Sequence, residues 1–295
     1  MNLSSPAAVR ALMSRHGLRP RRRFGQNFLA DANVLAKIAA AGDLAAGDCV
    51  VEIGSGLGVL TQALAAAVGA EGRVVTIEVD RSLIPVLAET VGSLKQVSVV
   101  TDDALSLNWP EFLSDRFGAD RLGRIAVIAN IPYNITSPLL STLLPHRSWF
   151  RAIVFLVQKE VGLRLCAAPA TPDYGALSVF VQYQAAVEIV ANVSRTVFFP
   201  VPDVDSAIVR LVPYVDPPVA VADEALFQSV VRAAFGQRRK SLLNALSGDP
   251  SLGWSREQAL AGLATAGIEP GRRGETLSVA EFARLASFAP APLNS

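Results

Sequence analysis

The amino-acid sequence predicts an α/β fold, built on a mostly parallel, doubly wound sheet and followed by a small all-helical C-terminal domain. The first observation is an alternation, between Gly47 and Val157, of short Val/Ile-rich runs with longer segments of helical spacing. Strands that alternate with helices are typical of βαβ units, whose parallel strands are buried on both faces. The second is a composition break at 213–223, where Asp216-Pro217-Pro218 interrupts regular structure and a helical pattern follows.

The expected strands are nearly continuous apolar runs. They are Cys49–Ile53, Arg73–Ile77, Val97–Val100, Arg124–Ala129, Ala152–Val157, Val187–Val193 and Ser206–Val212. The segments between the first five have helical length and spacing, which predicts helices at Leu60–Val68, Leu83–Val91 and Pro138–Leu144. The last two strands have no helix between them, so we expect an antiparallel pair at the edge of the sheet.

The C-terminal part carries its own helix signals. Glu224–Phe235 has an apolar face, and the pairs Ser255/Gln258 and Ser278/Glu281 have the spacing of a capping box. We therefore expect a first domain at residues 1–213, which begins with a basic arm at 1–23, and a helical domain at 223–295.

Composition limits the class of protein. Hydrophobic residues make up 51% and charged residues 18%, which supports a large core and excludes global disorder. No apolar run approaches the ~18 residues of a membrane span, and the N-terminus lacks the pattern of a secretion signal. With 2 cysteines and 2 histidines, a disulfide framework or a Cys/His zinc site is close to excluded. We expect a reduced, cytoplasmic protein that binds no metal and no membrane.

Positive charge is clustered although the net charge is only +1. The first thirty residues contain arginines and no acidic residue; these are Arg10, Arg15, Arg19, Arg21, Arg22 and Arg23. Further clusters occur at Arg238-Arg239-Lys240 and Arg272-Arg273. Clustered arginine is typical of surfaces that contact a phosphate backbone. From charge alone, a solvated tail or helix face is the more common explanation.

Polar and glycine residues follow the first three expected strands. Gly54, Gly56 and Gly58 let a ligand approach the backbone beside the next helix, without the third glycine position of the dinucleotide fingerprint. Glu78 ends the second strand, where a carboxylate can accept both hydrogen bonds of a ribose diol. Asp103 follows the third strand and can accept from the amine of an adenine. Each acid by itself could instead belong to a turn or helix cap.

The most specific segment follows the fourth strand, at 130–138. Pro132 and Pro138 hold a rigid loop, in which Asn130 offers a carbonyl oxygen and Tyr133 an aromatic face. An amide that accepts from an N–H group and a ring that stacks can together hold a planar base bearing an amino group. The loop therefore predicts a site for such a base at the same edge of the sheet.

Asn130-Ile131-Pro132-Tyr133 after a glycine-loop strand resembles the N6-adenine methyltransferases that act on ribosomal RNA. Other segments are similar to further motifs of that family: Phe24–Leu29, Tyr174–Ser178, Phe198–Ser206 and Arg238–Leu242. The resemblance runs from Phe24 to Leu285. It implies a Rossmann-like sheet that binds S-adenosylmethionine.

The resemblance also implies a role for each matching residue. The residues that would bind S-adenosylmethionine are Asn27, Leu29, Gly54, Glu78, Asp103 and Asn130. The catalytic residues would be Asn130, which would touch both cofactor and target, and Tyr133 and Phe198, which would sandwich the target base. The clustered charge, together with the RNA substrate that the resemblance implies, predicts RNA binding by Arg21, Arg22, Arg23, Arg238, Arg239 and Lys240. Two positions depart from the family: Ser55 replaces a frequent proline, and Asp203 replaces a common lysine, which puts one expected phosphate contact in doubt.

The implied activity is dimethylation of N6 of two adjacent adenosines in a hairpin loop near the 3′ end of small-subunit ribosomal RNA. The expected partner is that RNA within a pre-30S particle, and the expected state is a monomer. One alternative is the large-subunit adenine methylase of the macrolide-resistance type, and Phe24–Leu29 together with Phe198–Ser206 favour the small-subunit enzyme. Another is a non-catalytic RNA-binding relative, against which the glycine loop, Glu78 and Asn130 argue. An NAD oxidoreductase is the least favoured, because nothing resembles a hydride-transfer acid.

Overall fold

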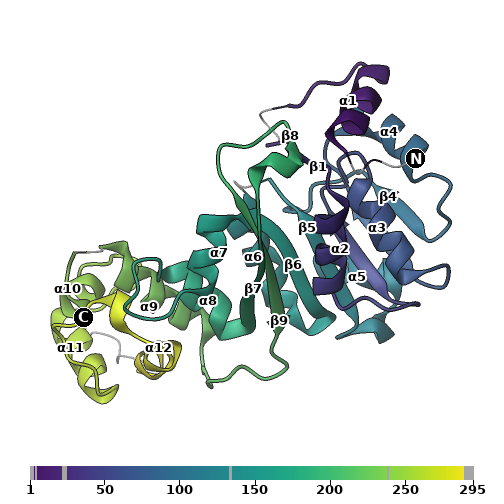
Figure 1. The fold of residues 1–295 in the computed structure, drawn as a ribbon. Coiled ribbons are helices and arrows are strands. Elements are labelled where there is room, and N and C mark those ends of the chain that lie inside the picture. Colours follow the sequence, from purple (N-terminus) through teal and green to yellow (C-terminus); the bar gives the residue numbers. More distant parts are fainter. Residues whose placement is uncertain (1–2, 4, 22–24, 133–134, 238, 289–295) are drawn as a thin grey trace. The chain divides into compact units, whose positions relative to one another are not determined.

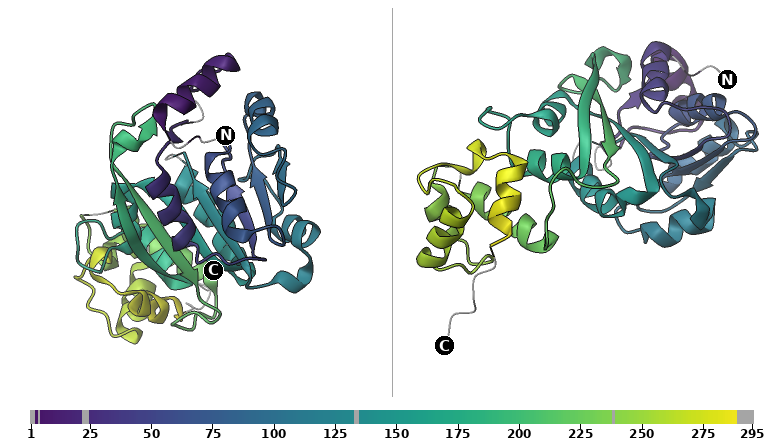
Figure 2. Two further views of the ribbon diagram at one scale, coloured as in Figure 1. Left: turned by 45° about the vertical axis from the view of Figure 1, so that its right-hand side comes forward. Right: turned by 90° about the horizontal axis from the view of Figure 1, so that it is seen from below.

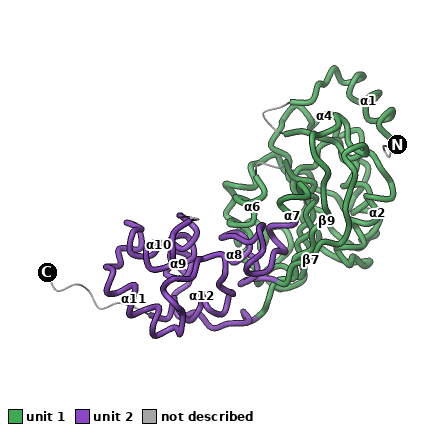
Figure 3. Tube along the Cα trace, turned by 60° about the vertical axis from the view of Figure 1, so that its left-hand side comes forward, with its two compact units in different colours: residues 1–162, 186–215 green, residues 163–185, 216–295 purple. Residues whose placement is uncertain are grey.

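The computed structural model describes residues 3, 5–21, 25–132, 135–237 and 239–288 (Figure 1). The chain divides into two compact units (Figure 3). The first contains residues 1–162 and 186–215, and the second contains 163–185 and 216–295. The division at 215/216 falls inside the proline-rich break that the sequence shows. Residues 163–185 also belong to the second unit, and no change in composition marks that segment in the sequence.

The first unit is built on a seven-stranded sheet in the order β4-β3-β2-β5-β6-β9-β7 (Figure 1). The strands are β2 (Cys49–Ile53), β3 (Arg73–Ile77), β4 (Val97–Val100), β5 (Ile125–Asn130), β6 (Phe150–Gln158), β7 (Ala185–Val193) and β9 (Ser206–Pro213). Strands β4, β3, β2, β5 and β6 pair in parallel, and β9 pairs antiparallel with β6. The expected α/β fold with a mostly parallel sheet is confirmed.

Burial explains why these runs form strands. Every residue of β2 is buried, as expected for a strand covered on both faces. Edge strand β7 instead alternates between buried or half-buried and exposed residues, because one of its faces meets solvent.

Helices α2 (Ala32–Ala41), α3 (Val59–Val68) and α4 (Ile84–Thr90) share one apolar core with the sheet. Helix α2 lies beside α3 (Figure 2). Ile38, Leu64 and Val86, one from each helix, are fully buried together with Val50 of β2. The connections after β4 and β5 contain α5 (Trp109–Phe117) and α6 (Thr136–Leu143). These helices bring the chain back to the start of each parallel strand, so all five strand ends point the same way.

A small second sheet, which the sequence did not predict, joins two distant segments of the first unit. Strand β1 (Phe28–Leu29) pairs antiparallel with β8 (Phe198–Phe199), so that Phe28 lies opposite Phe199 and Leu29 opposite Phe198. Helix α1 (Pro6–Arg15) packs on this pair, with the Arg10 guanidinium 5.4 Å from the Phe199 ring centroid. The chain entering the first unit is thereby fixed beside the segment that carries the Phe198–Ser206 motif.

The second unit is helical. It contains α8 (Ala176–Gln184), α9 (Glu224–Gly236), α10 (Leu242–Ser247), α11 (Arg256–Thr265) and α12 (Val279–Ala286), while α7 (Lys159–Cys166) spans the division. Its core contains Phe227, Leu263 and Phe282. Both expected capping boxes are present, at the starts of α11 and α12. In the described part of the chain, no helix has the length and apolar character needed to cross a membrane.

Candidate cofactor and base site

A cavity of about 230 Å³ lies at the carboxyl edge of the parallel strands in the first unit. Its walls come from segments far apart in the sequence: Gly25–Phe28, Gly54 and Gly56, Ile77–Val79 with Leu83, Asp102–Leu105, and Asn130–Pro132 with Ile135. The carboxyl edge of a parallel sheet is where ligands bind in doubly wound folds. Of the predicted cofactor residues, the cavity brings together Asn27, Gly54, Glu78, Asp103 and Asn130.

The glycines after β2 make a turn that other residues would strain. Gly54, Gly56 and Gly58 have φ values of 80°, 57° and 80°. A side chain at Gly58 would also place its Cβ 2.7 Å from Thr90 Oγ1 and 2.9 Å from Val91 Cγ1. The first two glycines therefore shape the cavity wall, and Gly58 lets α3 begin close to α4.

The Glu78 carboxylate is held by two backbone groups. Its Oε2 accepts from the Gly56 N–H and its Oε1 from the Asp80 N–H, each at 2.8 Å. The side chain is only 6% exposed, and burial raises the pKa of Glu78 although these hydrogen bonds lower it. The carboxylate thus faces the cavity in one orientation, as an acceptor for hydroxyl groups.

Asn130, at the end of β5, is oriented by the opposite wall. Its Nδ2 donates to the carbonyl oxygen of Asn27 at 3.2 Å, and Asn27 Nδ2 donates to the Gly25 carbonyl at 3.1 Å. An amide whose nitrogen is engaged in this way presents its Oδ1 as an acceptor. The orientation fits the predicted acceptor role of Asn130.

Asp103 lies on an exposed turn after β4. Its Oδ1 accepts from the Leu105 N–H at 3.0 Å, and its own N–H donates to Asp102 Oδ1 at 2.8 Å. Both carboxylates line the cavity. The hydrogen bond to Leu105 fits the interpretation of Asp103 as a loop acid, and its place in the cavity lining is also compatible with a contact to adenine.

Three predicted residues lie elsewhere. Leu29 and Phe198 face each other across the small sheet, are 3% and 1% exposed, and do not line the cavity. Arg21 is also absent from the lining of this cavity; its Nη1 pairs with Asp80 Oδ1 at 3.0 Å. Four further predicted residues, Tyr133, Arg22, Arg23 and Arg238, lie outside the described residues.

The C-terminal basic residues differ in their surroundings. Arg239 and Lys240 are exposed just after α9. Arg272, by contrast, donates to Glu281 at 2.5 Å and to the Thr276 carbonyl at 2.6 Å, within the second unit. This arginine joins two parts of the helical unit, so its presence in a charge cluster does not by itself indicate RNA contact.

Two acids at this edge were not predicted from the sequence. The first is Asp80, whose carboxylate is 2% exposed and accepts from Arg21, Gln26 and Ser82. Burial would raise the pKa of Asp80, but the hydrogen bonds from Ser82 and Gln26 and the Arg21 charge outweigh it, so the pKa is lowered. The sequence Ile77-Glu78-Val79-Asp80 contains a signal for it, because both acids follow one strand.

The second is Glu52, which is fully buried in β2. Its Oε2 accepts from Thr61 Oγ1 at 2.5 Å and Thr76 Oγ1 at 2.6 Å, and Thr76 also shares a 2.5 Å hydrogen bond with Ser55 of the glycine turn. Burial raises the pKa of Glu52 to about 8, against the lowering effect of the two threonines. Its Oε1 is buried without a hydrogen-bond partner. Glu52 therefore carries a proton at neutral pH.

Among the residues that the structure describes, no group of three or more His, Cys, Asp or Glu side chains is placed to hold a metal ion.

The comparisons with known proteins point to one family. The family model described as ribosomal RNA adenine dimethylase matches residues 17–289. A ribosomal RNA small subunit methyltransferase A from Pelotomaculum thermopropionicum is 49% identical over 287 residues, covering 96% of each chain. One from Moorella thermoacetica is 47% identical, covering 96% of this chain and 97% of the other.

Two solved structures are similar across the chain. A dimethyladenosine transferase from Plasmodium falciparum has a TM-score of 0.69 at 26% identity, covering 88% of this chain and 95% of the other. The 23S rRNA methyltransferase ErmE has a TM-score of 0.64 at 27% identity, covering 88% and 98%. Both support the Rossmann-like methyltransferase architecture expected from the sequence.

Proposed function

Because the chain belongs to the ribosomal RNA adenine dimethylase family, we infer that it is an S-adenosylmethionine-dependent methyltransferase of small-subunit ribosomal RNA. It dimethylates N6 of two adjacent adenosines in a hairpin loop near the 3′ end of that RNA. The observation that carries this proposal is the meeting of Glu78, Asp103 and Asn130 at one cavity beside a glycine turn.

The large-subunit alternative has less support. The relatives named as small-subunit enzymes are 41–49% identical over nearly the whole chain, whereas the large-subunit enzyme ErmE is 27% identical. A non-catalytic relative is not favoured either, because the glycine turn and the acceptors of the cavity are intact.

The residues present fit the proposed cofactor. Glu78 offers a carboxylate, fixed by two N–H groups, that can accept from both hydroxyls of a ribose. Asp103 can accept from the adenine amine, and the left-handed turn at Gly54 lets the methionine end approach the backbone. Asn27 contributes from the segment that crosses the cavity, and Leu29 supports that segment from β1. When bound, S-adenosylmethionine supplies the electrophilic methyl group.

Orientation of the target amine is the main task of the loop after β5. The exocyclic amine of adenine is a poor nucleophile, because its lone pair is delocalised into the ring. Hydrogen bonds from N6–H to Asn130 Oδ1 and to the backbone carbonyl of Ile131 localise that lone pair and aim it at the methyl group. Most of the acceleration then comes from positioning and preorganised acceptors, so a strong general base is not required.

Stacking completes the proposed base site. Tyr133 and Phe198 hold the unstacked adenine, at about 1–3 kcal/mol for each stacked ring. In the structure the Phe198 ring is buried against β1, so this role requires the ring to turn toward the cavity when RNA binds.

The proposed RNA contacts lie on both units. The basic arm, with Arg21, Arg22 and Arg23, and the cluster Arg238, Arg239 and Lys240 contact phosphates, which position the RNA without reading its sequence. The protein acts as a monomer on a pre-30S particle in the cytoplasm. The exposure of Arg239 and Lys240 supports this placement of the second cluster.

Mass spectrometry of RNA fragments tests the proposal. The protein is incubated with labelled S-adenosylmethionine and one RNA substrate at a time. The substrates are unmethylated small subunits, naked small-subunit RNA and large subunits. We expect dimethyladenosine at two adjacent positions, in the small subunit only. Label in large-subunit RNA would favour the macrolide-resistance type, and cofactor binding without label in any RNA would favour a non-catalytic relative.

A further inference from the structure

Asp80 connects the N-terminal chain to the cavity wall. Its Oδ1 accepts from Arg21 Nη1 at 3.0 Å and its Oδ2 from Gln26 Nε2 at 2.9 Å. Gln26 in turn accepts from the Arg21 backbone N–H at 2.9 Å. These bonds fix one end of the crossing segment, defined as residues 25–28, which forms one wall of the cavity.

The other end of the crossing segment is fixed by Asn130. Asn130 Nδ2 donates to the Asn27 carbonyl, and Phe28 is held in β1 opposite Phe199. The segment therefore runs from the end of β3 to the end of β5, pinned on both sides. Loss of either contact would free one side of the wall.

Asp80 also touches the proposed ribose acceptor. Its backbone N–H donates to Glu78 Oε1 at 2.8 Å, so one residue orients Glu78 through its main chain and the crossing segment through its side chain. The Asp80 side chain is 2% exposed whereas that of Arg21 is 43% exposed. A charged hydrogen bond whose acceptor is shielded from water is stronger than one on an open surface.

We propose that Asp80 is a positioning residue for the cofactor: it holds residues 25–28 across the cavity through Gln26 and Arg21 and thereby lowers the cost of ordering that wall when S-adenosylmethionine binds. This inference rests on the proposed function, because it assumes that the cavity holds the cofactor. A wall that is already ordered binds its ligand more tightly, since less conformational freedom is lost on binding.

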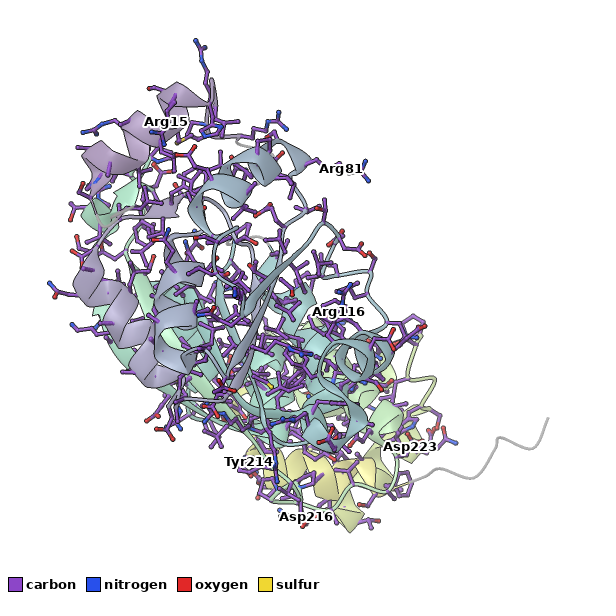
Figure 4. The ribbon with its side chains drawn as sticks, turned by 90° about the vertical axis from the view of Figure 1, so that its right-hand side faces the viewer. Arg15, Arg81, Arg116, Tyr214, Asp216 and Asp223 are labelled. Atoms are coloured by element: carbon purple, nitrogen blue, oxygen red, sulfur yellow. The ribbon has the colours of Figure 1, made fainter. Side chains whose placement is uncertain are left out.

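If Asp80 only stabilised its own turn, different results would be expected. Asp80 begins the short helical turn Arg81–Leu83, and its Oδ1 accepts from the Ser82 N–H at 3.1 Å and the Ser82 hydroxyl at 2.7 Å. The neighbouring Arg81 points away from the protein (Figure 4). If the turn were the whole role, a residue that keeps the Oδ1 contacts would leave the crossing segment and cofactor affinity unchanged.

Asp80→Asn separates the two roles, because asparagine keeps an oxygen for Ser82 and replaces the acceptor of Gln26 with a donor. Cofactor affinity is measured by calorimetry on the full chain, and hydrogen–deuterium exchange is followed in peptides covering 25–30. We expect S-adenosylmethionine to bind about tenfold more weakly, as for loss of a charged hydrogen bond, and exchange at 25–30 to become faster. The kcat at saturating cofactor should stay near normal while KM for the cofactor rises.

A double-mutant cycle with Gln26→Ala supplies the decisive comparison. In the Gln26→Ala background, Asp80→Asn should cost less than about twofold in affinity, because the contact is already lost. Asp48→Asn is the matched control: Asp48 also pairs with an arginine, Arg151, at 2.6 Å and accepts from a backbone N–H, but lies before β2. It should change neither affinity nor exchange at 25–30.

The possible results are distinct. Wild-type affinity in Asp80→Asn, or full additivity with Gln26→Ala, would overturn the positioning role. A wild-type protein that does not bind S-adenosylmethionine at all would instead overturn the proposed function. If Asp80→Asn failed to fold, Arg21→Gln, at a 43% exposed side chain, should still accelerate exchange at 25–30, and unchanged exchange there would refute the proposal.

Discussion

Replacement of Glu52 by glutamine should remove a large part of the pH dependence of folding stability. Burial raises the pKa of Glu52 from 4.5 to about 8 in the folded protein. The folded state therefore holds this proton more tightly than the unfolded state does. The stability gained is fully present below pH 4.5, and it is lost as pH rises through about 8.

The size of the effect follows from the two pKa values. Each pKa unit is worth about 1.4 kcal/mol, so wild-type stability should fall by about 5 kcal/mol between pH 4.5 and 8 from this group alone. Glutamine cannot ionise, and its amide oxygen can accept from Thr61 and Thr76 as Glu52 Oε2 does. In this variant, the contribution of residue 52 to the free energy of unfolding should therefore not depend on pH.

Urea unfolding at pH 5, 6, 7 and 8, followed by tryptophan fluorescence, measures this difference. Relative to wild type, the free energy of unfolding of Glu52→Gln should increase by about 1.4 kcal/mol for each unit by which the pH rises. Glu71→Gln, on the exposed turn before β3, is the control for losing any one carboxyl group. Parallel pH profiles for wild type and Glu52→Gln would refute a protonated Glu52.

Three further predictions concern the proposed site. Glu78→Ala should weaken S-adenosylmethionine binding by roughly 1.5–3 kcal/mol, measured by calorimetry, and unchanged affinity would remove Glu78 from the cofactor site. Replacing Arg239 and Lys240 together by alanine should flatten the salt dependence of RNA binding by about one unit of slope per lost phosphate contact, with cofactor affinity unchanged; an unaltered slope would mean a solvated surface only. Asn130→Ala should cut the single-turnover methylation rate by on the order of 10²-fold and alter the ratio of monomethyl to dimethyl product, because a monomethylated N6 has one N–H fewer; near-normal rates would contradict its orienting role.

The parallel core of the first unit was predictable because its strands are continuous Val/Ile-rich runs, of which β2 and most of β3 are buried on both faces. The runs Cys49–Ile53, Arg73–Ile77 and Val97–Val100 coincide with β2, β3 and β4. Glycines and acids that directly follow such runs must meet at one edge, so the gathering of Gly54 and Glu78 could also be anticipated.

Other features depend on tertiary contacts that no local pattern encodes. Strands β1 and β8 have two residues each, too few for a periodic signal, and Phe198 is buried by residues distant in the sequence. Glu52 looks in the sequence like any other acid near a strand end, and its proton follows from complete burial, which outweighs the lowering of its pKa by Thr61 and Thr76. Asp80 gains its role from Arg21 and Gln26, over fifty residues earlier in the chain.

The pairing of β1 with β8 also limits when the first unit can be completed during synthesis of the chain. Phe28 and Phe199 are separated by about 170 residues, so the small sheet cannot close until the chain past residue 199 has left the ribosome. At roughly 5–20 residues per second, this takes on the order of ten seconds or more after Phe28 is made. Through that interval the nascent chain can form its early βαβ units but not the strand pair that holds Phe28 in the cavity wall.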